Sequence, residues 1–284
     1  MIRIGGILLG IGFTVVVLFS FLTGAYNWAT EEAHGSAEHE FYKAPIDVAF
    51  PFDGALAKWD LAQLQRGYQV YKEVCAACHG MKFVAFRDFA ELGYTEDEVK
   101  AIAAEWQTVP GVDPDTGEAI IRAGEPTDYI PSPYPNAVAA AAANNNAIPP
   151  DLSLMAKARG DGSDYIFSLL TGYGPIPADL KEEYPEFATP PGLHFNQYFP
   201  NLNIAMAPPL TANGQVTYAD GTDATIGQMS KDVSAFLTWT AEPTMVERKR
   251  TGWPVLGFLL FATILAYFAK KQVWADAKRK KTVD

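Results

Sequence analysis

Apolar positions divide the chain into two long hydrophobic runs and a central segment in which they recur at helical spacing. The first run, residues 4–22, is nineteen residues long and contains no charged side chain. A membrane span needs about 20 apolar residues, whereas the apolar core of an export signal has about 7 to 15. We therefore expect a retained membrane anchor in preference to a cleaved signal. Either would export the residues that follow.

The second hydrophobic run, residues 253–269, is predicted to cross a membrane with its C-terminal end in the cytoplasm. Three basic residues precede the run and six follow it, which is the asymmetry of the positive-inside rule. Basic clusters on both sides also argue against a buried core helix. These residues are Arg248, Lys249 and Arg250, then Lys270, Lys271, Lys278, Arg279, Lys280 and Lys281. We expect three parts: a hydrophobic segment at 1–29, an exported domain at 30–247, and an anchor with a basic tail at 248–284.

Three stretches of the central segment have the apolar spacing of helices. The first begins after Asp60 and the last begins after Thr225, and each of these residues precedes a glutamine by three positions, as in a capping box. A shorter stretch, residues 164–171, ends at Gly172. The apolar positions of the longer stretches are Leu61, Leu64, Tyr68 and Tyr71, and Ile226, Met229, Val233 and Phe236. Proline-rich loops separate the stretches and no set of alternating strands is evident, so we expect a mainly α domain with long loops.

The charges of the chain are unevenly distributed. The whole sequence has a net charge of −11, but residues 30–247 carry 12 Lys and Arg against 31 Asp and Glu, a local balance of −19. A surface this acidic repels a phosphate backbone, which excludes nucleic-acid binding and favours a cationic protein partner. The densest acidic clusters are Glu96-Asp97-Glu98, Asp113 with Asp115, and Glu182-Glu183. Either they attract such a partner or they only keep an exported domain soluble, and both interpretations stay open.

The two cysteines of the chain lie in Cys75-Ala76-Ala77-Cys78-His79, the attachment signature of c-type haem. In this signature both thiols bond to the porphyrin and the histidine binds the iron. A redox-active cysteine pair would need a preceding buried strand, whereas a helix is predicted here, and a zinc site would need a second pair of ligands. We therefore expect one covalent haem c with His79 as an iron ligand. The haem would also supply an apolar body for the irregular loops to wrap.

The second axial ligand of the iron is expected on the opposite haem face, far along the chain from His79. The candidates are His34, His39, His194, Met81, Met155, Met206, Met229 and Met245. Met206 is favoured because it begins Met206-Ala207-Pro208-Pro209, a proline-stiffened loop shortly before the last helix of the domain. His194 is the alternative. Methionine ligation raises the reduction potential and leaves no open iron position, as suits an electron carrier.

Several ordered motifs together resemble cytochrome c1, the haem subunit of the cytochrome bc1 complex. The resemblance covers roughly residues 50–275. Besides the cysteine motif, it rests on residues 144–153, 164–173, 195–200, 206–209 and 232–243. Two departures stand out. The family normally has a cleaved export signal or a larger precursor, and the extra disulfide of some bacterial members is excluded here because both cysteines are committed to haem.

The resemblance implies a class I cytochrome c fold with long loop insertions, followed by a C-terminal transmembrane anchor. It also implies that Met206 is the sixth iron ligand and that Arg159 lies near a haem propionate, where its charge would compensate the carboxylate. Four further residues are candidates for the surroundings of the haem, with ordinary packing as an equal alternative. These are Tyr165 and Asn144 as hydrogen-bond donors near the haem edge, and Pro149 and Pro150 as a wall of the pocket.

The resemblance implies a function as well. One electron would come from the Rieske iron–sulfur subunit and pass on to a basic cytochrome c, while quinol chemistry would belong to partner subunits that include cytochrome b. The whole complex would be a dimer in the inner membrane, with the haem domain on the periplasmic side and no catalytic residue on this chain. The alternatives are a membrane-anchored cytochrome of another respiratory complex, a haem sensor or catalyst with an open iron position, and an assembly anchor whose haem is structural.

Overall fold

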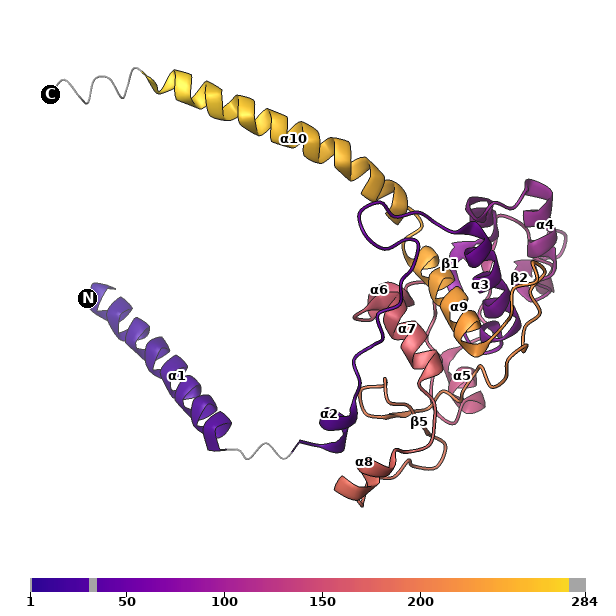
Figure 1. The fold of residues 1–284 in the computed structure, drawn as a ribbon, viewed down its shortest axis with the longest axis horizontal. Coiled ribbons are helices and arrows are strands. Elements are labelled where there is room, and N and C mark those ends of the chain that lie inside the picture. Colours follow the sequence, from indigo (N-terminus) through magenta and orange to yellow (C-terminus); the bar gives the residue numbers. More distant parts are fainter. Residues whose placement is uncertain (1, 31–34, 276–284) are drawn as a thin grey trace. The chain divides into compact units, whose positions relative to one another are not determined.

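The computed structural model describes residues 2–30 and 35–275 of the chain (Figure 1). The chain forms two units, Met1–Phe41 and Tyr42–Asp284. The first unit contains α1 (Ile2–Thr30) and α2 (Ala37–Phe41), and the second contains every other described element. Helices dominate both units, so the predicted mainly α character is confirmed.

Two helices are long and apolar enough to cross a membrane. They are α1, in which Arg3–Trp28 qualify, and α10 (Met245–Val273). The large apolar side chains of residues 3–28 in α1 and of residues 253–273 in α10 are exposed. Because α10 does not bury them against the rest of its unit, the alternative of a buried core helix for residues 253–269 does not apply. Both helices coincide with the hydrophobic runs of the sequence.

The core of the second unit is built on α3 (Leu61–Glu73) and α9 (Ile226–Ala241), which pack side by side (Figure 1). Both helices begin where the sequence predicts. The side chains of Asp60 and Thr225 accept hydrogen bonds from backbone amides three residues ahead, at 3.2 and 3.1 Å. A Cβ added at Gly67 would collide with the carbonyl oxygen of Asp232 and lie 2.6 Å from Cβ of Phe236. Glycine at this position therefore permits the close approach of the two helices.

Asp232 is fully buried between these helices and accepts hydrogen bonds from three side chains. The donors are Nε of Arg66 at 2.9 Å, Nε2 of Gln63 at 3.2 Å and Nε2 of Gln228 at 2.8 Å. The two expected capping boxes therefore form only in part, because both glutamine side chains bond to Asp232 instead of to the helix starts. Arg66 also donates to the more exposed Asp220 at 2.7 Å. This network compensates a carboxylate that would otherwise be costly to bury.

An aromatic cluster surrounds the contact between the two helices. The ring of Tyr68 lies 4.5 Å from that of Phe89 and 5.7 Å from that of Phe236, measured between centroids. Trp239 lies 6.3 Å from Phe89. Of the apolar positions predicted to form one face of α3, Leu61 alone is exposed. The buried aromatic rings make this helix pair the most extensive apolar contact of the unit.

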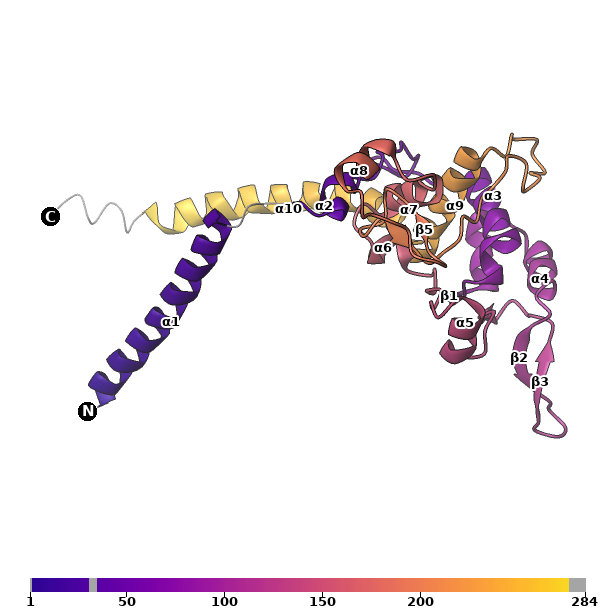
Figure 2. The ribbon, with the colours of Figure 1, turned by 90° about the horizontal axis from the view of Figure 1, so that it is seen from below.

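The remaining elements are short. The helices are α4 (Glu96–Ala104), α5 (Ala137–Ala143), α6 (Met155–Ala158), α7 (Gly162–Thr171) and α8 (Ala178–Glu183), with 3-10 turns η1 (Cys75–Ala77) and η2 (Phe86–Leu92). The strands form three antiparallel pairs: β1 (Met81–Ala85) with β4 (Tyr129–Ile130), β2 (Val109–Val112) with β3 (Ala119–Arg122), and β5 (His194–Phe195) with β6 (Asn203–Ile204). These strands were not predicted, because two to five residues are too few for an alternating pattern to be visible. The hairpin of β2 and β3 projects beyond α4 (Figure 2).

Candidate functional site

The cysteine motif lies in a tight turn directly after α3. The carbonyl oxygen of Cys75 accepts hydrogen bonds from the amides of Cys78 and His79, at 3.1 and 2.9 Å. The hydroxyl group of Tyr71, in the last turn of α3, donates to the carbonyl oxygen of His79 at 3.0 Å. Both thiols are free. The turn therefore presents two thiols and one imidazole together at the end of α3.

One nitrogen of the His79 ring is fixed by the backbone. Its Nδ1 lies 2.7 Å from the carbonyl oxygen of Pro150. A carbonyl oxygen only accepts, so the proton is on Nδ1 and the lone pair is on Nε2. Burial lowers the pKa of His79, although the Pro150 carbonyl acts in the opposite direction. A neutral, oriented imidazole with a free Nε2 is the form that binds a metal.

The segment that carries Pro150 is tied to the residues after the motif. The amide of Leu152 donates to the carbonyl oxygen of Gly80 at 2.9 Å, and the amide of Lys82 donates to Oδ2 of Asp151 at 2.9 Å. Asp151 thus acts by positioning the Pro150 carbonyl against His79. Pro149 is half-buried and Pro150 is exposed, so neither is enclosed in the protein core.

The surroundings of the two thiols differ. Cys75 is half-buried, and desolvation of its thiol raises the pKa of that thiol to about 12. The hydroxyl group of Tyr134 donates a weak hydrogen bond to Sγ of Cys78 at 3.9 Å and accepts one from Nδ2 of Asn144 at 3.0 Å. Asn144 therefore acts on the motif through Tyr134. Tyr134 was not predicted, because a single tyrosine in a proline-rich loop forms no recognisable pattern.

A second set of residues is organised around α7 and the loop of Met206. The hydroxyl group of Tyr173, just after α7, donates to the carbonyl oxygen of Met206 at 3.0 Å. Burial raises the pKa of Tyr173, which keeps this hydroxyl protonated as a donor. Met206 itself is half-buried. Tyr173 was not predicted either, because it donates its hydrogen bond to a main-chain atom 33 positions away.

Asn196 stabilises the same region, and it lies in residues 195–200, one of the segments on which the resemblance rests. It is fully buried, donates to the carbonyl oxygen of Leu169 at 2.7 Å and accepts from the amide of Tyr198 at 3.0 Å. Tyr173 and Asn196 also pair as an isolated antiparallel bridge. The end of α7 and the loops before Met206 therefore form one hydrogen-bonded assembly.

Arg159 and Tyr165 lie beside this assembly. Tyr165 is buried, and burial raises its pKa, while the positive charge of Arg159 opposes that effect. Tyr165 also interacts electrostatically with Tyr173. Arg159 is exposed, and its guanidinium donates to the carbonyl oxygen of Ala158 at 3.1 Å. The structure thus brings Arg159, Tyr165 and Met206 into one neighbourhood, linked through Tyr173.

The two sets of residues share a loop contact and a common core. A Cβ added at Gly192 would collide with the side-chain amide of Asn145, so the loop after α5 touches the loop before β5. Asn145 and Asn146 both have positive φ, 52° and 63°, which asparagine tolerates better than most residues. Half-buried apolar residues from both sets pack on the same core cluster. They include Cys75, Ala76, Met155, Phe167 and Leu170.

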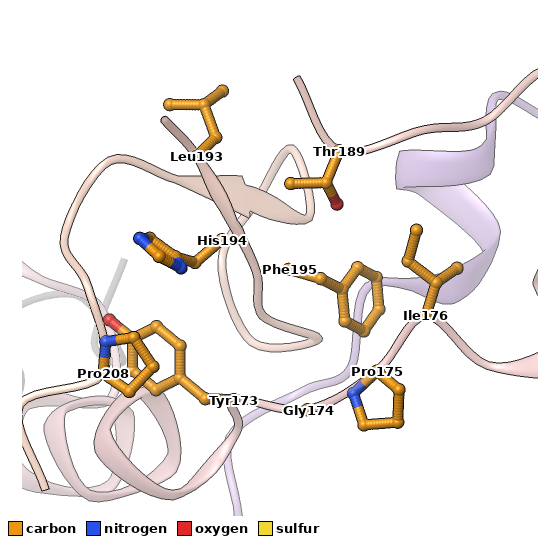
Figure 3. Close-up of a pocket in the computed structure, with 9 residues that line it drawn as sticks. All are labelled: Tyr173, Gly174, Pro175, Ile176, Thr189, Leu193, His194, Phe195 and Pro208. Carbon is orange, nitrogen blue, oxygen red and sulfur yellow. The ribbon is translucent and has the colours of Figure 1, made fainter. Parts of the chain in front are cut away.

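His194, the alternative ligand, lines a cavity beside the Met206 loop. The cavity has a volume of about 280 Å³ and is also lined by Tyr173, Thr189 and Pro208. Figure 3 shows the His194 ring on the same side of this cavity as Tyr173 and Pro208, away from Ile176 and Thr189. None of its lining residues belongs to the cysteine motif. The cavity is therefore separate from the cysteine motif, and the candidate site is defined by the side chains of the motif.

The other ligand candidates belong to the core of the second unit, to the first unit, or to residues outside the described ranges. Met81 and Met229 are fully buried, Met245 is nearly so, and all three belong to the core cluster. His34 lies outside the described residues, and His39 lies in α2, in the first unit. Met155 remains half-buried against the core.

The residues present fit a covalently attached haem. Two free thiols lie two residues apart, an adjacent imidazole has Nδ1 engaged and Nε2 available, and apolar side chains around them are only half-buried. No cluster of three or more His, Cys, Asp or Glu suited to a metal ion occurs in residues 2–30 and 35–275. Two thiols and one adjacent imidazole are the side chains that covalent attachment of a haem c would use.

Comparison with known proteins identifies similar chains. Residues 50–277 match the Cytochrome C1 family. The chain is 48% identical over 248 residues to "Cytochrome b/c1" of Bradyrhizobium diazoefficiens, which covers 82% of this chain and 36% of that protein. It is 47% identical over 234 residues to cytochrome c1 of Rhodospirillum rubrum, covering 79% and 85% of the two chains. It is 46% identical over 255 residues to the mitochondrial cytochrome c1 heme protein of Saccharomyces cerevisiae, covering 89% and 79%.

Proposed function

The chain belongs to the cytochrome c1 family, and from this membership and the site geometry we propose that it is the haem-bearing electron-transfer subunit of a quinol–cytochrome c reductase, the cytochrome bc1 complex. The observation that carries the proposal is the cysteine turn, in which His79 is oriented by the Pro150 carbonyl at 2.7 Å next to two free thiols. This arrangement supports covalent haem c with His79 Nε2 as an axial ligand.

Each residue of the site has a role in this proposal. Bound haem supplies a one-electron couple at its iron. Cys75 and Cys78 would attach it by thioether bonds, and His79 together with the side chain of Met206, in a loop fixed by Tyr173, would hold its iron. The remaining residues line the haem: Arg159 and Tyr165 near a propionate, Pro149 and Pro150 along the pocket wall, and Asn144 through Tyr134.

The partners follow from the family. The chain accepts one electron from the Rieske iron–sulfur subunit and passes it to a cytochrome c, and it has no catalytic site of its own. It assembles with cytochrome b in a dimeric complex. The class I cytochrome c fold of residues 30–247 is part of the same proposal, and the packing of α3 against α9 supports it.

We also propose a membrane arrangement. α10 anchors the chain in the inner membrane with the C-terminus in the cytoplasm, and the haem domain lies on the periplasmic side. The exposed apolar surface of α10 supports the membrane span, and the excess of basic residues on its C-terminal side, six against three, supports the orientation. α1 is either a second anchor or an export signal.

Replacing Met206 by leucine tests the ligand assignment. The variant is expected to lose the weak far-red absorption band of methionine-ligated ferric haem and to have a lower midpoint potential, because thioether ligation favours the reduced iron. The exchange conserves volume, so the fold should be kept at a cost below about 1.5 kcal/mol. The measurements are the visible spectrum and a redox titration of the haem-bearing full chain.

The matched control is Met155→Leu, since Met155 is half-buried like Met206. This variant should keep both the band and the potential. A wild-type spectrum without the band would contradict methionine ligation, and a Met206→Leu variant that retains the band would assign the ligand elsewhere.

Ionic strength tests the proposed attraction of a basic cytochrome. The acidic surface should raise the encounter rate, so the second-order rate of electron transfer should fall as salt rises, because the screening length shrinks from about 30 Å at 0.01 M to about 8 Å at 0.15 M. The rate is measured by stopped-flow absorption. Ferricyanide, an anionic acceptor, serves as the control and should react faster as salt rises. A rate with the basic cytochrome that does not change with salt would exclude electrostatic attraction.

A further inference from the structure

The loop of residues 51–58 is fastened to the start of α10. Nζ of Lys249 donates to the carbonyl oxygen of Phe52 at 3.0 Å, and Nε1 of Trp253 donates to the carbonyl oxygen of Ala55 at 3.1 Å. Because the two donors are four positions apart, they lie on one face of α10. The loop therefore runs along that face, next to the base of the helix (Figure 1).

The shape of this loop is fixed from within. The amide of Lys58 donates to the carbonyl oxygen of Pro51 at 3.1 Å and closes the loop. Oδ2 of Asp53 accepts from the amide of Phe50 at 2.8 Å, so this carboxylate bonds back to the start of the loop. Nε1 of Trp59 donates to the carbonyl oxygen of Pro243 at 3.2 Å, just before α10. The tip, Ala55 and Leu56, is therefore held in place and carries no charge.

The position of the loop tip relative to the membrane follows from Trp253, its hydrogen-bond partner on α10. Trp253 is the first residue of the apolar run and follows the basic residues 248–250. Tryptophan at such a position lies at the level of the lipid headgroups. The carbonyl oxygen of Ala55 accepts the hydrogen bond from Trp253, and the Cα of the next residue is about 3.8 Å from the Cα of Ala55. That residue, Leu56, is 88% exposed, the largest fraction among the exposed large apolar side chains of the described residues.

We propose that Leu56 inserts into the membrane interface beside α10 and gives the haem domain a second contact with the lipid. The occupant of this surface is lipid because the loop is bonded to the membrane helix at interface depth and presents an uncharged apolar tip there. The inference rests on the proposed role of α10 as the anchor. A contact displaced from the helix axis restricts rotation and tilt of the haem domain relative to the membrane.

Site-directed spin labelling tests the insertion. In Leu56→Cys, the new thiol is the only free one once Cys75 and Cys78 are bonded to haem. The haem-bearing full chain is reconstituted into phospholipid vesicles, and the label is probed by power saturation with oxygen, which concentrates in lipid, and with a water-soluble nickel chelate. The label at 56 should be more accessible to oxygen than to nickel.

Two matched positions make the outcomes distinguishable. Val138→Cys, on α5 and 79% exposed, should show the reverse ratio, and Leu259→Cys, on α10 and 53% exposed, should show the lipid ratio. A nickel-accessible label at 56 with a lipid-exposed label at 259 would overturn the insertion and leave the anchor intact. A label at 56 shielded from both reagents would mean that protein covers the tip, and it would overturn the insertion as well. A nickel-accessible label at 259 would overturn the anchor and the insertion together.

Discussion

Replacing Asp232 by alanine is expected to lower the free energy of unfolding by about 3 to 5 kcal/mol, the usual cost of breaking a buried ion pair. The variant leaves the guanidinium of Arg66 in a site where only 15% of its side chain is exposed. It also removes the acceptor of Gln63 and Gln228, so three donors on two helices lose their partner. Urea unfolding of the detergent-solubilised, haem-bearing chain, followed by haem absorption, measures the effect.

Asp220→Ala is the matched control for this prediction. Asp220 accepts from the same guanidinium at 2.7 Å, but 42% of its side chain is exposed, so solvent replaces it and the loss should be a small fraction of that at Asp232. Asp232→Asn should fall between the two, because it keeps an acceptor and loses the charge. Equal unfolding midpoints for Asp232→Ala and Asp220→Ala would mean that the buried network does not hold the helix pair together.

Gly67→Ala is expected to destabilise the protein by about 3 kcal/mol or more, the upper end for overpacking of a core. The added methyl group would collide with the backbone of Asp232 and lie 2.6 Å from Cβ of Phe236, and neither atom belongs to a flexible side-chain end. The helices must therefore separate, which disrupts the packing of Tyr68 and Tyr71 against Phe236. Thermal unfolding followed by far-ultraviolet circular dichroism measures the loss.

The control is Gly227→Ala, in the first turn of α9. A Cβ at Gly227 meets nothing within 4 Å. Alanine should therefore stabilise the helix by about 0.5 to 1 kcal/mol, through its lower conformational entropy in the unfolded chain. A Gly67→Ala variant as stable as Gly227→Ala would contradict the close approach of the two helices.

The helix pair could be predicted from the sequence, but the contact between its members could not. Apolar spacing and the caps Asp60 and Thr225 locate the first residue of both helices. Asp232 gives no such signal, because a carboxylate on a helix normally faces solvent and nothing local marks it as buried. Its role depends on Arg66, which lies 166 positions away.

In the candidate site, too, the residue types could be predicted from the sequence and the contacts between them could not. The spacing of Cys75, Cys78 and His79 predicts the attachment chemistry, whereas Pro149 and Pro150 were candidates for the pocket wall with ordinary packing as an equal alternative. The sequence does not indicate that the carbonyl oxygen of Pro150 orients His79, because every residue has a main-chain carbonyl and the residue type does not show what that group contacts. Tyr134 and Tyr173 escaped prediction for a related reason, because each acts through a hydrogen bond between separate loops.

The distance in sequence between α3 and α9 also determines how the domain tolerates changes of length. Their contact closes a loop of 166 residues, measured from Arg66 to Asp232. The entropy of closing a loop depends on the logarithm of its length, so deleting about 30 of these residues would change the closure free energy by only about 0.2 kcal/mol. Projecting segments such as the β2–β3 hairpin can therefore be shortened or extended during evolution with almost no effect on the pairing of the two helices, provided that the residues between them that contact the core are kept.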